Sequence, residues 1–289
     1  DLRKAFATVF SVYRNVAVES YYGERAAVIN YPISNTSWAA PQATDDGYKV
    51  AFSVDKDGND IYTSDMTAEQ RYEAALNAAL GFFEAAGYTV TDGKLTAAPE
   101  GAKLEYELQI PADGTGNHPS FMMVSEASKA LETIGMKLIV TDLTNSSEMW
   151  TSIDARQVDM WCAAWGATID PDMYQIYYSD VANFSGDKGV GTTPYGGPHQ
   201  GGSNYMYCIT DADLDTMIMQ ARESLDQSYR KTMYKACLDT VVDWAVEVPV
   251  YQRQNAIIFS TERVNMETVT PDITTFYGWM SEIENTELK

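Results

Sequence analysis

The sequence has few of the residues on which metal sites and disulfide frameworks depend. It holds three cysteines and two histidines among 289 residues. Cys162, Cys208 and Cys237 are odd in number and far apart, so they predict neither a disulfide framework nor a CxxC metal site. His118 and His199 each lie beside a proline and far in sequence from any cysteine, which is typical of surface histidines. We therefore expect buried thiols, no metal centre and no cofactor.

Catalytic signatures and long apolar runs are missing as well. The sequence has no GxSxG elbow, HExxH pair, GxxxxGKS/T loop or Rossmann glycine triplet. The glycine-rich stretch 196–203 lacks the lysine and the following helix of a phosphate cradle, so it predicts a flexible loop. No apolar stretch is long enough to cross a bilayer. The chain opens at Asp1 in a helical pattern without a signal peptide, as a fragment of a secreted protein or a cytoplasmic protein would.

Positive charge is also in short supply. The chain has 20 Lys and Arg residues against 41 Asp and Glu, a formal net charge of −21. This charge would repel phosphate backbones and anionic lipids, so nucleic acid and a direct membrane surface are excluded as expected partners. What is present is typical of a globular protein with a sizeable core: 45% hydrophobic residues and 19 tyrosines, whose amphipathic rings suit either a wet binding cleft or ordinary core and surface positions.

Helical patterns mark the first part of the chain. Apolar residues at helical spacing predict a helix from Leu2 to Ala17. Thr67 with Gln70 predicts a capping box, which starts a second helix that ends at Gly87.

Between these helices, residues 48–62 predict a hairpin whose turn is acidic. An EF-hand loop that started at Asp55 would need Gly and Glu where the sequence has Asp60 and Met66. We therefore expect a plain turn and no calcium site.

The middle of the chain alternates strand and helix. Residues 104–110, 137–140 and 158–163 predict strands, and helices are predicted over 119–135 and from Asn145. This order implies parallel pairing with right-handed crossovers. The fold class is therefore α/β.

The last third begins with a stretch, 180–203, in which glycine, proline and polar residues predict a long functional or mobile loop. Helices are predicted over 211–224 and 226–245. Strands are predicted over 246–250 and 256–259, and a polar tail follows with an aromatic cluster at 276–279.

The segment 161–174, WCAAWGATIDPDMY, directly follows a predicted parallel strand. Ligands of open α/β sheets bind beyond the carboxyl ends of the strands, so its tryptophans and aspartates predict a cleft lining. The tryptophans could also belong to the core, and Asp170-Pro171-Asp172 could cap the next helix. As a third alternative, Asp170 and Asp172 could form the acid/base pair of a glycosidase.

A series of short motifs runs along nearly the whole chain. They are Leu2-Arg3-Lys4-Ala5-Phe6 through Tyr13-Arg14, Phe82-Phe83-Glu84-Ala85-Ala86-Gly87-Tyr88, Ala130 through Leu138, Val158-Asp159-Met160-Trp161, Asp170-Pro171-Asp172, the helix residues Asp215, Ile218, Arg230 and Tyr234, and Val248-Pro249-Val250-Tyr251. In their number, order and spacing these motifs resemble the C-terminal half of the peptide/nickel/oligopeptide class (family 5) of extracellular solute-binding proteins of ABC transporters.

The resemblance implies a two-lobed clamshell, the type II periplasmic-binding-protein fold, with a mixed sheet flanked by helices. Residues 1–249 are expected to form the second lobe. Residues 250–289 are expected to supply a hinge-crossing strand and the returning C-terminal segment of a first lobe that lies upstream. The resemblance also implies an extracytoplasmic protein with an upstream lipid anchor, which docks onto the permease subunits of an importer.

The resemblance further implies a ligand site in the loop after the 158–163 strand and on the returning strand. The expected ligand-binding residues are Trp161, Cys162, Trp165, Asp170, Asp172, Asn204, Tyr205, Tyr251 and Arg253. Of these we expect Trp161, Trp165 and Tyr251 to line the cleft. Peptide binders of the family often hold the ligand's α-amino group with an aspartate three residues after the tryptophan, where this sequence has Ala164. Trp165 favours stacking on an apolar or sugar-like face instead, and Asp170 or Asp172 are alternative partners for a cation.

The function we expect is capture of a peptide or similar small solute followed by lobe closure about a hinge, without covalent chemistry. The chain is therefore expected not to be an enzyme. The alternatives are a secreted carbohydrate-active enzyme that uses Asp170 and Asp172, and a structural adhesion module.

Overall fold

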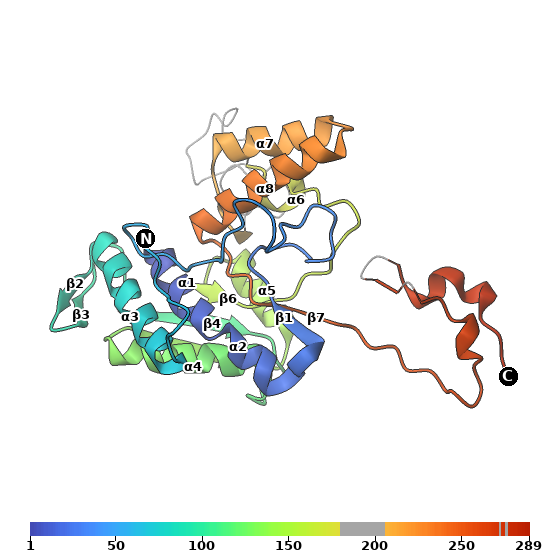
Figure 1. The fold of residues 1–289 in the computed structure, drawn as a ribbon. Coiled ribbons are helices and arrows are strands. Elements are labelled where there is room, and N and C mark those ends of the chain that lie inside the picture. The colour runs from blue at the N-terminus through green and yellow to red at the C-terminus, as the bar shows by residue number, and fades with distance from the viewer. Residues whose placement is uncertain (180–205, 272, 275–276) are drawn as a thin grey trace.

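The computed structural model describes residues 1–179, 206–271, 273–274 and 277–289 (Figure 1). The helices are α1 (Leu2–Val12), α2 (Arg14–Ala17), α3 (Ala68–Ala85), α4 (Pro119–Thr133), α5 (Ser146–Asp154), α6 (Tyr174–Tyr177), α7 (Ala212–Glu223) and α8 (Gln227–Trp244). The strands are β1 (Ala26–Val28), β2 (Thr89–Thr91), β3 (Lys94–Ala97), β4 (Glu105–Ile110), β5 (Lys137–Asp142), β6 (Met160–Trp161) and β7 (Tyr251–Arg253). Short helical turns lie at Val18–Tyr22, Gly23–Arg25, Met266–Thr268 and Trp279–Asn285.

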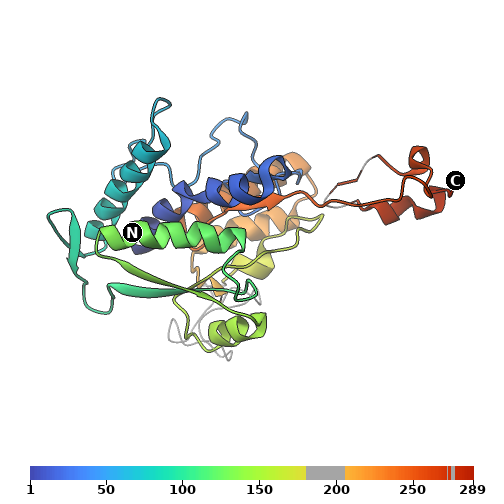
Figure 2. The same ribbon diagram turned by 90° about the horizontal axis from the view of Figure 1, so that it is seen from below.

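The centre of the fold is a parallel sheet in the order β5-β4-β6. Leu108 of β4 pairs with Val140 of β5 on one side and with Met160 of β6 on the other. Figure 2 shows α4 on one side of these strands and α5 on the other. The predicted strand–helix alternation and parallel pairing are confirmed, although β6 keeps only a short part of the expected 158–163 strand.

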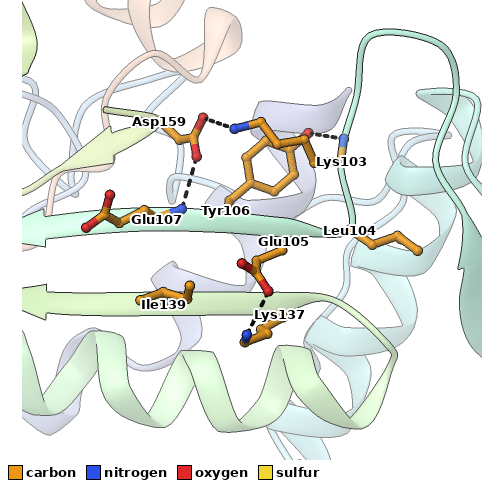
Figure 3. A pocket seen from close by; sticks show the side chains of 8 residues that line it. All are labelled: Lys103, Leu104, Glu105, Tyr106, Glu107, Lys137, Ile139 and Asp159. Carbon is orange, nitrogen blue, oxygen red and sulfur yellow. Dashed lines mark hydrogen bonds and ion pairs between the residues drawn. The ribbon is translucent and has the colours of Figure 1, made fainter. Parts of the chain in front are cut away.

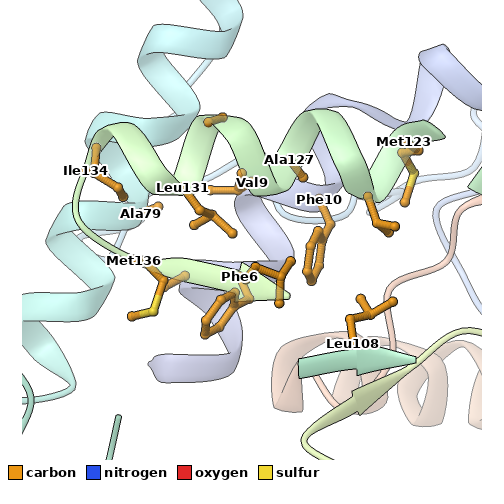
Figure 4. Close-up of a cluster of buried hydrophobic side chains, with 14 of the residues drawn as sticks. Phe6, Val9, Phe10, Ala79, Leu108, Met123, Ala127, Leu131, Ile134 and Met136 are labelled. Atoms are coloured by element: carbon orange, nitrogen blue, oxygen red, sulfur yellow. The ribbon is translucent and has the colours of Figure 1, made fainter. Parts of the chain in front are cut away.

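The main core lies between this sheet and helices α1, α3 and α4. Phe6 of α1 meets Phe83 of α3 and Tyr106 of β4 edge-on, both at 5.4 Å between ring centroids. Leu131 of α4 is fully buried in the same cluster. Figure 4 shows the labelled side chains of α1 and α4 pointing into one shared space. Because truncating a buried phenylalanine costs about 3–5 kcal/mol, Phe83 is a major source of stability.

The ends of α3 and α4 follow the chemistry predicted from the sequence. The capping box of α3 is complete, since the Thr67 hydroxyl accepts the Gln70 N–H and the Gln70 side chain accepts the Thr67 N–H. Beyond α4, Gly135 has φ +85°, and a Cβ there would lie 2.7 Å from the carbonyl oxygen of Leu95. Only glycine fits at this helix stop.

A second core forms where α6, α7 and α8 meet the loop around Tyr31 and Ala39. Tyr234 of α8 is fully buried at its centre. Both long helices begin at aspartate N-caps, because Asp211 accepts backbone N–H groups of α7 and Asp226 accepts those of α8. In Figure 1 these helices gather on the opposite side of the β1–β7 pair from α3 and α4.

Arg14 joins the helical layer to the segment that leaves β1 and the segment that leads into β7. Its buried guanidinium donates to the carbonyl oxygens of Ile29 (2.8 Å), Pro249 (3.0 Å) and Ser11 (3.0 Å), and to the Asn30 side chain. Burial lowers the pKa of Arg14 to about 10. Because β1 and β7 pair antiparallel just beyond these carbonyls, Arg14 fixes the base of the pair.

The hairpin predicted over 48–62 is present in short form, with an antiparallel bridge between Val54 and Asp60 around the acidic turn. Three other sequence predictions are wrong. Cys208, which was expected to be a buried thiol, is exposed. Residues 246–250 and 256–259 are not strands. The strand is β7, which begins after Pro249, a residue without the N–H that a ladder needs. Residues 256–259 have no neighbouring strand to pair with in the described part of the chain.

The segment after β7 extends away from the rest of the chain (Figure 1). It is held by its own contacts, such as the bridge between Val264 and Leu288 and the edge-on packing of Phe259 on Trp279 at 5.7 Å. Its apolar side chains are unusually exposed, and Ile258 is 94% exposed. Phe276 and the predicted 180–203 loop lie outside the described residues.

Candidate ligand-binding site

The carboxyl ends of β4, β5 and β6 meet at one edge of the sheet because the strands are parallel. We call this the strand-end edge. It consists of β4's last residue and the loop 111–118, Asp142 at the end of β5, and Trp161 with the loop 162–173 after β6. Helices α4 and α5 begin here as well.

Asp142 fixes the loop 111–118. Its Oδ1 accepts the N–H groups of Ala112 and Gly114, each at 3.0 Å, and its Oδ2 accepts that of Gly116 at 2.8 Å. Gly114 has φ +67°, and a Cβ there would lie 2.5 Å from the Thr144 side chain. The loop is therefore rigidly placed, and it ends at His118, whose side chain caps α4.

Aromatic rings gather at the same edge. Trp161 packs against Trp150 of α5 and against Tyr207, each at 5.8 Å between ring centroids. Trp165 lies 6.4 Å from Trp150, and its indole Nε1 donates to the hydroxyl of Tyr207 at 3.0 Å. Trp165 is 52% exposed. The structure therefore brings Trp161 and Trp165 together, as part of a cluster whose other members sequence reasoning missed.

An enclosed carboxylate lies behind this cluster. The Tyr177 hydroxyl donates to Glu247 Oε2 at 2.7 Å. Burial and the nearby Glu247 charge raise the pKa of Tyr207. Burial also raises the pKa of Glu247, and the hydroxyls of Tyr177 and Tyr207 only partly offset this rise. Burial, assisted by the nearby Glu247 charge, raises the pKa of Tyr177. Sequence reasoning missed Glu247 because nothing in VEVPV marks it as enclosed.

Tyr251 and Cys162 lie together at another part of the edge. Tyr251 contacts Tyr22 at 5.3 Å between ring centroids, and the Ser120 hydroxyl lies 3.5 Å from the Tyr251 hydroxyl. Burial raises the pKa of the Cys162 thiol to about 11, so it is neither a nucleophile nor a thiolate ligand at neutral pH. No direct contact joins the Tyr251 ring to Trp161 or Trp165 in the described residues.

Asp170 and Asp172 are committed to arginines. Asp170 pairs with Arg230 Nη2 of α8 at 2.9 and 3.0 Å. Asp172 lies 3.2 Å from Arg222 Nε of α7, and its Oδ1 accepts the Tyr174 N–H at the start of α6. Asp172 therefore lies directly before Met173, the N-cap of α6, and these pairs attach the loop 162–173 to the second core.

The remaining expected site residues are less informative. Arg253 is exposed on β7. Asn204 and Tyr205 lie outside the described residues.

A shallow hollow of about 730 Å³ lies at the other end of the sheet, beside the amino ends of β4 and β5 (Figure 3). Four of its charged groups form ion pairs: Lys103 with Asp159, and Lys137 with Glu105, each at 2.7 Å. The fifth, Glu107, accepts the Thr141 hydroxyl, and Ile139 contributes an exposed apolar surface. Because these charges already have partners and the pairs are open to solvent, this hollow offers a ligand little to bind.

Membrane-spanning helices and metal-ligand clusters are both missing from the described residues. Within the described ranges, no helix combines the length and the apolar character that a membrane span requires. Nor do the described residues contain a group of three or more His, Cys, Asp or Glu side chains placed to hold a metal ion.

Comparison with known proteins defines the class of fold. No family model matches the sequence, and no curated protein matches it. Solved structures do match, and they are solute-binding proteins. The chain therefore has the mixed α/β fold of part of the family 5 oligopeptide- and nickel-binding proteins, which confirms the resemblance at the level of fold.

Three of these structures illustrate the match. One is the oligopeptide-binding protein from Thermus thermophilus complexed with a pentapeptide, with TM-score 0.65, 16% identity, and coverage of 97% of this chain and 42% of that one. A second is the oligopeptide-binding protein AppA from Bacillus subtilis with a nonapeptide, with TM-score 0.58, 18% identity, and coverage of 88% and 42%. The third is NikA from Brucella suis with Fe(III)-EDTA, with TM-score 0.54, 19% identity, and coverage of 88% and 42%. The chain thus spans less than half the length of these proteins.

Proposed function

We propose that the chain is the second lobe of the extracytoplasmic solute-binding component of an ABC importer, which holds a peptide or similar small solute between two lobes and delivers it to a permease. The observation that carries this proposal is the fold match, which covers 97% of this chain but only 42% of the Thermus thermophilus protein. In this proposal the protein binds its solute without chemical conversion, and it is anchored upstream by a lipid.

The proposed division of the chain follows the β1–β7 pair. Residues 1–249 contain both cores and the strand-end edge, and they form the second lobe. Residues 250–289 include β7 and the extended segment, which returns to the first lobe. The exposure of Ile258, Met280 and Leu288 supports this division, because large exposed apolar side chains gathered in one segment mark a surface that packs against another body.

At the strand-end edge, no unpaired charge is offered by Ala164, Asp170 or Asp172, which supports contact with an uncharged part of the solute. Ala164 is exposed and provides no carboxylate, while Asp170 and Asp172 pair with Arg230 and Arg222. Trp165 offers an exposed apolar ring face at the same place. A neutral flat or apolar group of the solute fits this face better than an ammonium group does.

The test uses the complete protein of which this chain is a part. It is titrated with a pool of neutral tri-, tetra- and pentapeptides, and binding is detected by thermal shift and by native mass spectrometry. We expect a saturable rise in Tm and a mass increase equal to intact peptide.

Trp165→Ala is expected to lower the affinity for the pool, whereas Tyr229→Ala, which removes an exposed ring of α8 whose hydroxyl lies beside Gln220 of α7, is the matched control. Absence of binding by the pool would remove peptides as the solute. Release of hydrolysis products from peptides or oligosaccharides would contradict the binding function and favour the carbohydrate-active or another enzyme.

A further inference from the structure

The rings of the strand-end edge are connected by hydrogen bonds and ring packing to an enclosed acid. The indole N–H of Trp165 donates to the Tyr207 hydroxyl oxygen at 3.0 Å. The ring of Tyr207 packs on that of Tyr177 at 5.5 Å, and the Tyr177 hydroxyl donates to the Glu247 carboxylate at 2.7 Å. Glu247 also lies near the Tyr207 hydroxyl, because burial and the Glu247 charge together raise the pKa of Tyr207. These residues come from four places in the sequence, so the fold itself assembles this chain of contacts.

The hydrogen bond to Tyr207 restrains the Trp165 side chain, which ring packing by itself would hold only weakly. Trp165 is 52% exposed, and its ring contacts Trp150 only at a tilted 6.4 Å. By contrast, Trp161 is half-buried between Trp150 and Tyr207, each at 5.8 Å. The indole N–H is the one polar group of the Trp165 side chain, so its bond to Tyr207 sets the direction in which the ring faces.

Tyr207 is itself fixed from behind. Its ring lies between Trp161 at 5.8 Å and Tyr177 at 5.5 Å. Its hydroxyl accepts from Trp165 and lies near the Glu247 carboxylate. A carboxylate is a strong acceptor, so the hydrogen bond from Tyr177 to Glu247 fixes the ring against which Tyr207 packs.

We propose that Tyr207 and Glu247 are positioning residues, which hold the ring of Trp165 at a fixed angle at the strand-end edge and so present a rigid flat face to the solute. This inference rests on the proposed function, in which Trp165 contacts the solute. Neither Tyr207 nor Glu247 touches the solute in this account. A platform that is held in place before binding loses less side-chain entropy when the solute arrives.

The connection also reaches toward the hinge. Glu247 lies four residues before Tyr251, the first residue of β7, and Pro249 between them accepts a hydrogen bond from Arg14. The backbone that carries Glu247 is therefore held at the base of the β1–β7 pair. A fixed backbone at this point gives the carboxylate a fixed position for the two tyrosines.

The first test uses the unaltered chain and needs no ligand. Indole N–H exchange with solvent is measured by NMR for the six tryptophans, with Trp165→Phe to assign the Trp165 signal. We expect the Trp165 indole N–H to exchange at least about ten-fold more slowly than that of free tryptophan, despite its exposed ring, because a hydrogen-bonded N–H exchanges only when the bond opens. Exchange at the rate of free tryptophan would overturn the proposal.

The second test compares variants of protein labelled with 5-fluorotryptophan. Tyr207→Phe removes the acceptor of the indole N–H, and Glu247→Leu removes the acceptor of the Tyr177 hydroxyl and the carboxylate near Tyr207. We expect both to shift or broaden the ¹⁹F signal of Trp165. Glu247→Gln retains a carbonyl acceptor, so it is expected to keep the Trp165 signal near its original position.

The control is Tyr88→Phe, which removes a hydroxyl that is hydrogen-bonded to Lys103 and Tyr106 far from the edge. It is expected to leave the Trp165 signal unchanged. A Trp165 signal that is equally unaffected by Tyr207→Phe, or equally disturbed by Tyr88→Phe, would overturn the proposal. If the peptide pool fails to bind while the Trp165 signal behaves as expected, the proposed function fails and the positioning roles stand.

Discussion

The two ends of the parallel sheet differ in how their polar groups are used. At the amino ends of β4 and β5, Lys103 and Lys137 form solvent-exposed pairs with Asp159 and Glu105 across an open hollow. At and behind the strand-end edge, carboxylates are partly enclosed and fix other parts of the fold: Asp142 accepts backbone N–H groups of the loop 111–118, and Glu247 accepts the Tyr177 hydroxyl. The strand-end edge is therefore the more rigidly arranged surface, and this rigidity, which the open hollow lacks, favours it as the binding site.

The largest effect is expected from Asp142→Ala. This change removes the acceptor of three backbone N–H groups, at Ala112, Gly114 and Gly116. Because a hydrogen bond to a charged group contributes about 1.5–3 kcal/mol, we expect the free energy of unfolding to fall by about 2 kcal/mol or more. Urea denaturation measures it. If Asp142→Ala lost no more free energy of unfolding than Lys137→Ala, which breaks an exposed ion pair at the amino ends, the two ends of the sheet would not differ in this way.

A somewhat smaller effect is expected on solute binding by the complete protein when Trp165 is truncated. We expect Trp165→Ala to weaken binding of the peptide pool about ten-fold, or about 1.4 kcal/mol, since stacking on an aromatic ring is of this order. Isothermal calorimetry measures the change. The matched substitution Lys103→Ala at the amino-end hollow is expected to leave the affinity unchanged. An equal loss of affinity in Lys103→Ala would place the binding site at the amino ends of the strands and not at the strand-end edge.

Glu247→Gln is expected to change how stability depends on pH. Burial raises the pKa of Glu247, so over the interval between the unfolded and the folded pKa the folded state keeps a proton that the unfolded chain has released. Stability is therefore lost as pH rises through that interval, and the cost persists above it. The Tm of Glu247→Gln should match that of the original protein near pH 4 and exceed it at pH 7. A variant that is less stable at pH 7 would show that the carboxylate charge is stabilising there.

The smallest effect is expected from Lys137→Ala, which breaks the exposed pair with Glu105. Such pairs contribute about 0–1 kcal/mol, and salt screens them. We expect a change in the free energy of unfolding of about 0.5 kcal/mol or less, which vanishes in concentrated salt. A loss as large as that of Asp142→Ala would mean that the two ends of the sheet are organised alike.

Local chemistry predicted much of the fold. The Thr67–Gln70 capping box, the first-turn proline at Pro119 and the stop at Gly135 act within a few residues, so the sequence shows them directly. The strands that failed depend on partners instead. Residues 256–259 are apolar enough for a strand, but a strand forms only where another lies beside it.

The candidate site shows the same division. Trp161 and Trp165 were expected at this edge because ligand loops follow strand ends, and the place of Asp172 just before a helix was visible in the sequence. The partners Tyr207, Tyr177 and Glu247 were missed because they are separated by tens of residues and only the folded chain brings them together. The arginine partners of Asp170 and Asp172 were missed for the same reason.

Hydrogen–deuterium exchange of the complete protein, with and without the bound peptide pool, tests the central claim most directly. We expect peptide binding to slow amide exchange in the loops 111–118 and 162–173 at the strand-end edge and in the β1–β7 pair at the proposed hinge. Amide exchange of residues 103–107 at the amino-end hollow is expected to stay as before. Protection centred on residues 103–107 and 137–139, with the strand-end loops unchanged, would contradict the central claim.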